Sequence, residues 1–397
     1  MNKILKAEEN VIRFLENKMI YIYLVVALLV SLAIRYFGLP FVSGDMSTYL
    51  IGWYGQIEQL GQIHALNTQV GNYNVLYQTI IAILTYIPGD PIVKYKAVSI
   101  IFDYVAAVGV FLLIYDKEKK NSKFMAILGA IITVFSPIVF LNSSVWGQCD
   151  SIYISFIILS LVAYKKEKPA LCMIFFGLAF AFKLQAIFYL PFYLFEWFRK
   201  KSFSVLNFLL VPLTMIVVCI PAYINGRGFW GFISPYYYQT GSCDKMSFNY
   251  QSFWTILSDS REKRLEYIST MKVPAVLITF LVLLSIMTWL IYRKKELNER
   301  GSLYLAFLLA FTCVEFLPGM HERYGFGVEI LSIVLAFKDK RTIPLAIALN
   351  ILTMITYGAE LFGGVMNITI LGIINFAIYL TYMYFFYRNL RGIVPNR

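Results

Sequence analysis

The stretch MIYIYLVVALLVSLAIRYF, residues Met19–Phe37, decides the class of fold. It exceeds the roughly 18 apolar residues that make a membrane-spanning helix the expected structure. No small-residue cleavage site follows a short apolar stretch, so we expect a retained anchor and not a removable signal. Further apolar segments follow in a chain of 397 residues that is 59% hydrophobic and 15% charged, with a mean hydropathy of +0.66. The sequence therefore predicts an all-α polytopic membrane protein.

Basic clusters between the apolar segments indicate which loops are cytoplasmic, because Lys and Arg near helix ends stay inside. No Lys or Arg occurs between Tyr36 and Asp90, so this stretch is expected on the outer side. Helices threaded between the clusters predict about twelve crossings, with both termini in the cytoplasm. The expected spans are residues 19–37, 92–115, 124–141, 151–164, 170–182, 184–197, 204–222, 273–292, 302–317, 325–337, 342–358 and 366–386.

Two segments need separate treatment in this topology. Val75–Ile87 is short for a span, and counting it would place the basic cluster 117–123 outside, so we expect an interfacial helix. Residues 170–198 are split at Lys183, because a single helix would place Arg199–Lys201 outside. An amphipathic pattern over Met46–Leu60 predicts a second interfacial helix in the same outer loop.

The whole chain, residues 1–397, is expected to form one integral membrane domain with three parts. The first part is residues 1–222 with the outer loop 38–91, the second is a large aromatic-rich outer loop over residues 223–272, and the third is the C-terminal helices over residues 273–397. A net charge of +12 suggests nucleic acid at first sight, but the basic residues cluster at helix ends, which favours a membrane and excludes a nucleic-acid partner.

The cysteines and histidines predict no metal site. The five cysteines are scattered without metal-ligand spacing, and only two histidines occur. Cys149 and Cys243 could pair on an oxidising face, although free thiols are the favoured interpretation.

Polar residues that the topology brings to the outer face are the candidates for a functional site. Ionisable groups at membrane depth cost on the order of 2.5–3.5 kcal/mol each, so a cluster of them usually lines a wet cavity or a site. The group consists of Asp45, His64, Asp150, Lys183, His321, Glu322 and Arg323.

Each candidate also has an ordinary structural explanation. Asp45 follows Gly44 and could cap the helix expected over Met46–Leu60. Asp150 ends the run Asn142–Asp150, which includes Trp146 and Gln148, and could cap the next helix. His64 stands alone in its loop, so a structural role is favoured.

The motif Met320-His321-Glu322-Arg323-Tyr324 lies in a short outer loop. Arg323 presents fixed donors suited to a phosphate, and Lys183 offers a compact charge for the same group. A simple ion pair between Glu322 and Arg323 is the alternative.

Three acidic residues, Asp103, Glu315 and Glu329, lie clearly inside the expected spans. For Asp103 we favour a structural ion pair with Lys96 or a hydrogen-bonded carboxyl group. Glu315 and Glu329 flank the His-Glu-Arg-Tyr loop and are expected to support it from behind.

This arrangement resembles the GT-C superfamily of integral membrane glycosyltransferases, which use sugars on polyprenyl or dolichyl phosphate. The resemblance implies that residues 1–222 form the catalytic module and that Asp45 is the acidic residue of the first outer loop. Four short motifs look like those of bacterial relatives of the second GPI mannosyltransferase: Trp146–Asp150, Phe182–Gln185, Asn249–Trp254 and His321–Tyr324. A bacterial plasma membrane is the location implied. A double-acid metal motif is absent, so a divalent cation remains possible but unsupported.

The resemblance implies inverting transfer of a hexose, mannose-like, from a polyprenyl-phosphate donor to a glycan or lipid-linked acceptor. Asp45 would be the general base. Lys183 and Arg323, with His321, would stabilise charge on the departing phosphate. Asp150, Gln148 and Trp146 are expected to contact substrate, and the aromatic loop 223–272 to supply apolar faces for sugar rings.

Two other classes stay open. A polysaccharide polymerase or ligase uses a similar architecture with a lipid-linked chain as donor. A flippase or transporter needs polar residues through the membrane, whereas here most lie on one face, and no half-to-half symmetry is visible.

Overall fold

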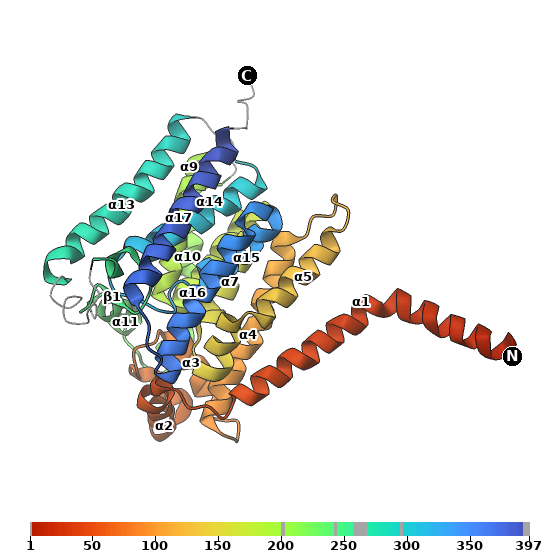
Figure 1. Ribbon diagram of the computed structural model, residues 1–397. Coiled ribbons are helices and arrows are strands. Elements are labelled where there is room, and N and C mark those ends of the chain that lie inside the picture. Colours follow the sequence, from red (N-terminus) through yellow and green to blue (C-terminus); the bar gives the residue numbers. More distant parts are fainter. Residues whose placement is uncertain (1, 200–202, 242–243, 258–267, 294–296, 392–397) are drawn as a thin grey trace.

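The computed structural model describes residues 2–199, 203–241, 244–257, 268–293 and 297–391 (Figure 1). In these residues the chain is helical except for loops and one pair of two-residue strands. The long helices run roughly alongside one another as a bundle, and α1 projects from one side of it (Figure 1). The all-α class predicted from hydropathy is confirmed.

The first half of the chain supplies the elements that surround most of the buried centre. In chain order they are α1 (Asn2–Gly38), η1 (Met46–Leu50), α2 (Ile51–Gln59), η2 (Gln62–Asn67), α3 (Val75–Leu84), α4 (Pro91–Ile114), α5 (Ser122–Phe135), α6 (Pro137–Phe140), η3 (Leu141–Trp146), α7 (Asp150–Lys165), α8 (Pro169–Phe182), η4 (Leu184–Tyr189) and α9 (Leu190–Arg199).

The second half closes the bundle. Its described elements are η5 (Val205–Leu209), α10 (Leu210–Ile224), α11 (Trp230–Gly241), β1 (Ser247–Phe248), η6 (Phe253–Thr255), α13 (Ile268–Tyr292), α14 (Glu299–Phe316), β2 (Met320–His321), α15 (Phe326–Lys338), η7 (Lys340–Thr342), α16 (Ile343–Phe362) and α17 (Ile368–Arg391). The strands β1 and β2 pair in parallel, with Ser247 opposite Met320 and Phe248 opposite His321.

Burial separates central helices from peripheral ones. α7 and α14 are buried along almost their whole length, whereas α1, α10 and α13 expose many large apolar side chains. Apolar side chains on the outer surface of a helical bundle are what lipid contact requires, since the bilayer core is as apolar as the protein interior. The pattern fits a multi-pass membrane protein.

Within the described ranges, six helical segments are long and apolar enough to cross a membrane, or seven if the bent pair of Ser122–Phe135 and Pro137–Trp146 forms one span. All twelve predicted ranges fall on helical segments, but the count of twelve spans is not confirmed. The five ranges outside the seven fall on α7, α8, η4 with α9, α14 and α15, which are shorter or more polar.

The two segments singled out from the sequence are resolved in detail. The helix predicted over Val75–Ile87 is present as α3, where six of its ten residues are buried. The helix break predicted at Lys183 is also confirmed: Lys183 has extended backbone angles, φ −151° and ψ 135°, between α8 and η4. Whether the two halves are separate spans stays a prediction.

The carboxylate of Asp103 does not pair with Lys96. Arg35 of α1 donates from Nε and Nη2 to Asp103 Oδ2 at 3.0 and 2.8 Å, and Ser143 donates to the same oxygen at 2.6 Å. Lys96 instead donates to three backbone carbonyls at the end of α1, including Gly38 O at 2.9 Å. The ion-pair prediction was wrong in its partner, because Arg35 on another helix comes closer.

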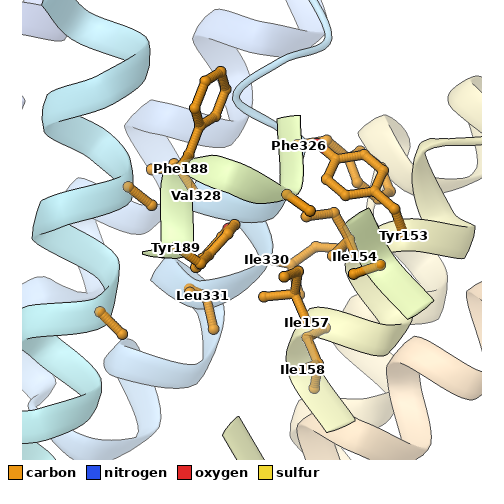
Figure 2. Packing of buried hydrophobic residues seen from close by; sticks show 14 of the residues in the cluster. Tyr153, Ile154, Ile157, Ile158, Phe188, Tyr189, Phe326, Val328, Ile330 and Leu331 are labelled. Atoms are coloured by element: carbon orange, nitrogen blue, oxygen red, sulfur yellow. The ribbon is translucent and has the colours of Figure 1, made fainter. Parts of the chain in front are cut away.

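A tight apolar core lies at the crossing of α7, η4 and α15. Figure 2 shows Tyr153, Ile154, Ile157 and Ile158 of α7 together with Tyr189 of η4 and the α15 residues Phe326, Val328, Ile330 and Leu331. Gly327 permits this contact, because an added Cβ would collide with the Tyr189 hydroxyl and the Ile154 side chain. The core fixes the start of α7 and the start of α15, which carry the polar residues described next.

Candidate active site

A pocket with a volume of about 910 Å³ lies where the predicted outer loops meet. Its walls come from the loop after α1, the turn before α7, the break at Lys183, the segment around β1, and the loop before α15. Four cationic side chains and three carboxylates line it: Lys183, Lys245, Lys272, Arg323, Asp45, Glu322 and Glu360.

The carboxylate of Asp45 is held through one of its two oxygens. Trp146 Nε1 and Gln148 Nε2 both donate to Oδ2, at 3.1 and 2.6 Å, and Arg323 Nη1 is 3.6 Å from the same atom. Within the described part of the chain, Oδ1 has no hydrogen-bond partner. The Asp45 side chain is 33% exposed and lines the pocket, so this second oxygen is available to a ligand.

The helix-capping explanation for Asp45 was wrong. Asp45 itself has helical backbone angles and its side chain makes no capping hydrogen bond. Ser43 takes that role, because its Oγ accepts a hydrogen bond from Met46 N at 3.2 Å while donating to Trp146 O at 2.8 Å. The carboxylate of Asp45 is thereby left for the pocket.

Asp150 lies behind the pocket and is fully buried. Lys183 Nζ donates to Asp150 Oδ1, and Asn142 Nδ2 donates to Oδ2 at 3.0 Å. Its position in the first turn of α7 suits a negative charge, although it makes no capping hydrogen bond. The direct effect of Asp150 is to hold the Lys183 ammonium group at the pocket wall.

Arg323 lies among three carboxylates. Its Nη1 donates to Glu322 Oε1 at 3.0 Å, its Nε is 3.8 Å from Asp150 Oδ2, and its Nη1 approaches Asp45. The guanidinium also lies 5.4 Å from the centre of the Trp146 ring, within cation–π range. The ion pair with Glu322 that we considered is present, together with contacts that place Arg323 in the pocket.

His321 is a neutral imidazole in this pocket. Burial, and then the neighbouring cations Arg323 and Lys183, lower its pKa to about 2. Its ring stacks on Phe248 with centroids 4.4 Å apart and an interplanar angle of 11°. His321 can therefore exchange hydrogen bonds with a ligand but does not add a positive charge.

Burial raises the pKa of Glu322 to about 7, against the lowering effect of Arg323. The side chain is nearly inaccessible, and its backbone N–H donates to Phe248 O at 3.1 Å, so the loop is tied to β1. Because Glu322 titrates near neutral pH beside the Arg323 guanidinium, the net charge of the pocket depends on pH in this range.

Five of the seven residues predicted for the site line this pocket: Asp45, Gln148, Lys183, His321 and Arg323. Trp146 and Asp150 do not line it but hydrogen-bond to residues that do. His64 lies elsewhere, with its Nδ1 3.2 Å from Asn225 Oδ1. The geometry places these residues together, and their substrate contacts stay predictions.

Several lining residues were missed by sequence reasoning. Tyr49, Trp53 and Tyr73 come from the first outer loop, Lys245 from the segment before β1, and Glu360 from the end of α16. Aromatic side chains make up 17% of the chain, so these three aromatic residues carried no distinctive signal. Of the aromatic loop 223–272, Phe248 lines the pocket, whereas Trp254 is buried and donates to Phe316 O at 2.8 Å.

The two acidic residues near the His-Glu-Arg-Tyr loop are buried. Glu315 accepts a hydrogen bond from Asn375 at 2.7 Å, and Glu329 accepts one from Thr353 at 2.8 Å. Neither lines the pocket, and Glu329 lies against Gly325 at the end of the loop.

The pairing of Cys149 with Cys243 cannot be followed, because Cys243 lies outside the described residues; Cys149 is buried with a free thiol. Across the described ranges, no group of three or more His, Cys, Asp or Glu side chains is placed to hold a metal ion.

The fold and the pocket define a multi-pass α-helical membrane protein with a charged pocket at one end of its bundle. The model of Glycosyltransferase family 87 matches residues 72–317, which is more than half of the chain, so the chain belongs to that family and is a glycosyltransferase. No curated protein matches the chain. The match includes Gln148 and Lys183, whereas Asp45 precedes it and the His321–Arg323 segment follows it.

Proposed function

We propose that this glycosyltransferase moves a hexose, mannose-like, from a polyprenyl-phosphate donor to a glycan or lipid-linked acceptor on the outer face of a bacterial plasma membrane. Transfer inverts the anomeric centre, and Asp45 is the general base. The observation that carries the proposal is the half-satisfied Asp45 carboxylate, which shares one pocket with Lys183 and Arg323.

The contacts of Asp45 suit a base. Trp146 and Gln148 fix the carboxylate through Oδ2, which leaves Oδ1 for the acceptor hydroxyl. A base must come within about 2.6–3.2 Å of the oxygen whose proton it takes. Because both donors bind Oδ2, the carboxylate keeps its orientation while Oδ1 stays able to accept a proton.

The cations suit the leaving group. Lys183 donates to Asp150 and Arg323 Nε lies 3.8 Å from the same carboxylate, so both cations stand at the pocket before a ligand binds. The Nε of Arg323 is buried without a hydrogen-bond partner. The guanidinium group therefore keeps one N–H donor that an anionic ligand could use, either directly or through a bridging water molecule. The neutral His321 adds one N–H donor for a phosphate oxygen.

The pocket also has an apolar side that suits a lipid-linked donor. It is lined there by Leu184, Ile187 and Phe188 of η4, by Val276 of α13, and by Leu317. Ile187 is 40% exposed, so an apolar surface continues outward from the cationic groups. A polyprenyl chain on this surface would leave its phosphate beside Lys183 and Arg323.

The proposed reaction is a single displacement. The acceptor oxygen forms a bond to the anomeric carbon as the bond from that carbon to the phosphate oxygen breaks. The electron pair of the broken bond stays on the phosphate, and the acceptor proton passes to Asp45 Oδ1. The products are the glycosylated acceptor and polyprenyl phosphate, with the charge on the latter stabilised by Lys183 and Arg323.

The outer location is supported by the opposite end of the bundle. There Lys165 and Lys338 lie 3.2 and 2.9 Å from the Glu299 carboxylate, at connections that belong to the basic clusters. The pocket-lining loops are the ones that the basic-residue rule assigns to the outer side.

The test is transfer from labelled polyprenyl-phosphate hexoses in proteoliposomes. Asp45→Asn keeps a similar shape but removes the proton acceptor, and a fall in kcat of about 10²–10⁴-fold is expected. Asp90→Asn is the matched control: Asp90 lies in the same outer loop, caps α4 through a 2.8 Å bond to Ile92 N, and is replaced by an equally good cap. Full activity in Asp45→Asn would remove the proposed base.

A further inference from the structure

The pocket residues form two contact groups that meet at Asp45. The first joins Lys183, Arg323, His321, Phe248 and Lys245 through the ion pairs and ring contacts given above and a 5.0 Å approach of Lys245 Nζ to the Phe248 ring. The second contains Tyr49, Trp53, Asn72, Tyr73, Gln148 and Gln239. The side chains of this second group are aromatic or neutral, and Gln148 connects the group to the Asp45 carboxylate.

The three aromatic rings of the second group form one platform. Tyr49 and Trp53 have centroids 5.7 Å apart, and Trp53 and Tyr73 have centroids 5.6 Å apart with an interplanar angle of 88°. The Trp53 ring lies on the backbone of Gly71, where an added Cβ would be 2.5 Å from Cδ2. Gly71 has φ +68°, so both its backbone angle and the approaching ring require glycine.

The platform is built on a fixed loop. Gln69 Nε2 donates to Gly71 O at 2.9 Å and to Tyr73 O at 2.7 Å. Arg227, in the loop after α10, donates to Gln69 and, at 3.0 Å, to Gln78 of α3. These hydrogen bonds from amide and guanidinium groups hold the loop in place before a ligand binds. Binding therefore does not incur the entropic cost of ordering the loop.

A short chain of hydrogen bonds connects the platform to the proposed base. Gln148 must turn its NH₂ group toward the Asp45 carboxylate, so its Oε1 faces Tyr73, and the Tyr73 hydroxyl donates to it at 3.2 Å. Tyr73 thereby fixes the amide that orients Asp45. Asp45 lines the same pocket as these rings, so a group lying on them would share that pocket with the carboxylate.

We propose that Tyr49, Trp53 and Tyr73 form the acceptor subsite, and that the acceptor presents there a neutral sugar ring and not a phosphate or other anion. This inference rests on the proposed function. The apolar C–H face of a pyranose suits an aromatic platform, and its hydroxyl groups suit Asn72, Gln148 and Gln239. An anion would meet the negative charge of Asp45, and none of the side chains of this group carries a positive charge.

The experiment measures binding of simple probes to the full-length protein in nanodiscs by saturation-transfer NMR. The probes are methyl α-hexopyranosides and the matching hexose 6-phosphates. Wild type is expected to bind the neutral hexosides at millimolar concentration and the phosphates more weakly. Trp53→Ala is expected to weaken hexoside binding about tenfold. Trp53→Phe keeps a ring and should lose less, which separates ring loss from misfolding.

Trp230→Ala is the matched control, because Trp230 is an exposed Trp of α11 outside the pocket lining. Donor affinity, measured separately with a labelled short-chain polyprenyl-phosphate hexose, is expected to depend on Lys183 and not on Trp53. The inference is overturned if wild type binds no hexoside, if Trp53→Ala binds as wild type does, or if the phosphates bind more tightly. Hexoside binding without transfer from any polyprenyl donor would contradict the proposed function but not the proposed subsite.

Discussion

Arg323 has contacts with Asp45, Asp150 and Glu322 in the free pocket, so its charge is shared among three carboxylates. A donor phosphate that binds Arg323 competes with these groups. The contact with Asp45 is the most exposed of the three: the atoms are 3.6 Å apart and the Asp45 side chain is one-third accessible, whereas Asp150 and Glu322 are buried. Donor binding is therefore expected to draw Arg323 away from the base, which leaves Asp45 better able to accept a proton.

Glu322 is expected to make donor binding depend on pH. Its pKa of about 7 means that it is neutral in mild acid and charged in mild base, where it offsets the guanidinium of Arg323. A phosphodiester donor keeps one negative charge over this range. The donor KM should therefore rise several-fold from about pH 6 to about pH 8, and Glu322→Gln should remove that rise.

The groups facing Glu322 bear on this prediction. They are Arg323, Asp45 and Glu360, with His321 neutral at these pH values. Because the pKa of Glu322 is raised by folding, its neutral form stabilises the fold at low pH, and that contribution is lost as the pH rises through about 7. Glu58→Gln, at an exposed carboxyl group outside the pocket, is the control and should keep the wild-type profile. An unchanged profile in Glu322→Gln would assign the pH dependence to another group.

At the residue scale, the sequence predicts which polar groups gather but not which atoms they contact. Asp45, Lys183 and Arg323 stand out because charged residues are rare in this chain. Asp45 was considered as an alternative cap of the first outer helix, whereas Ser43 makes that cap, since two cap-forming residues lie on either side of Gly44 and only the fold decides between them. Trp53 and Tyr73 gave no signal, because a platform of rings exists only once the loop is folded.

Among the elements, η3 is the one whose placement decides the site. It ends in Trp146 and leads to Gln148, the two donors to Asp45. Ser143 of η3 and Ser151 of α7 both donate to Asp103, which is paired with Arg35. One buried carboxylate thus connects α1, α4, η3 and α7.

Breaking this buried pair is expected to lower stability and activity together. Arg35→Leu leaves the Asp103 carboxylate buried without its cation, and loss of one partner of such a pair costs about 3–5 kcal/mol. Thermal unfolding in nanodiscs should show this loss, and kcat should fall because η3 is less well fixed. The double variant Arg35→Leu with Asp103→Asn should recover part of the stability.

The control for this variant is Lys119→Leu, which removes an exposed ion pair with Asp116. Exposed pairs contribute little, so its unfolding temperature should match wild type. If Arg35→Leu also unfolds like wild type, then η3 is positioned by apolar packing and not by the buried pair.

Hydropathy predicts the presence of the helices well. It does not predict where each helix ends or which side chains meet across different helices. The break at Lys183 followed from charge, because one continuous helix would have placed a basic cluster on the wrong side. The partner of Asp103 did not follow, because Lys96 is close to it along one helix, whereas Arg35 approaches from another helix through tertiary packing. The number of spans did not follow either, since α8 and α15 are too short to be assigned by length.

For the whole molecule, the orientation in the membrane is the assumption on which the proposed chemistry depends. A single cysteine introduced by Glu58→Cys should react with a membrane-impermeant maleimide in intact cells, whereas Lys119→Cys should react only after permeabilisation. Both sites are exposed, at opposite ends of the bundle by their loop charges. Cys219, which is not fully buried, and Cys243, which lies outside the described residues, are replaced by Ser in the background. The reverse labelling pattern would place the pocket in the cytosol.

The parallel pairing of β1 with β2 has a consequence for how substrates are exchanged. It joins the segment that carries Lys245 and Phe248 to the segment that carries His321 and Arg323, although some seventy positions separate them in the chain. Any motion that admits a bulky lipid past Phe248 must also shift the imidazole stacked on it. If the donor is lipid-linked as proposed, its arrival and the alignment of the groups that would bind its phosphate are then one mechanical event and not two.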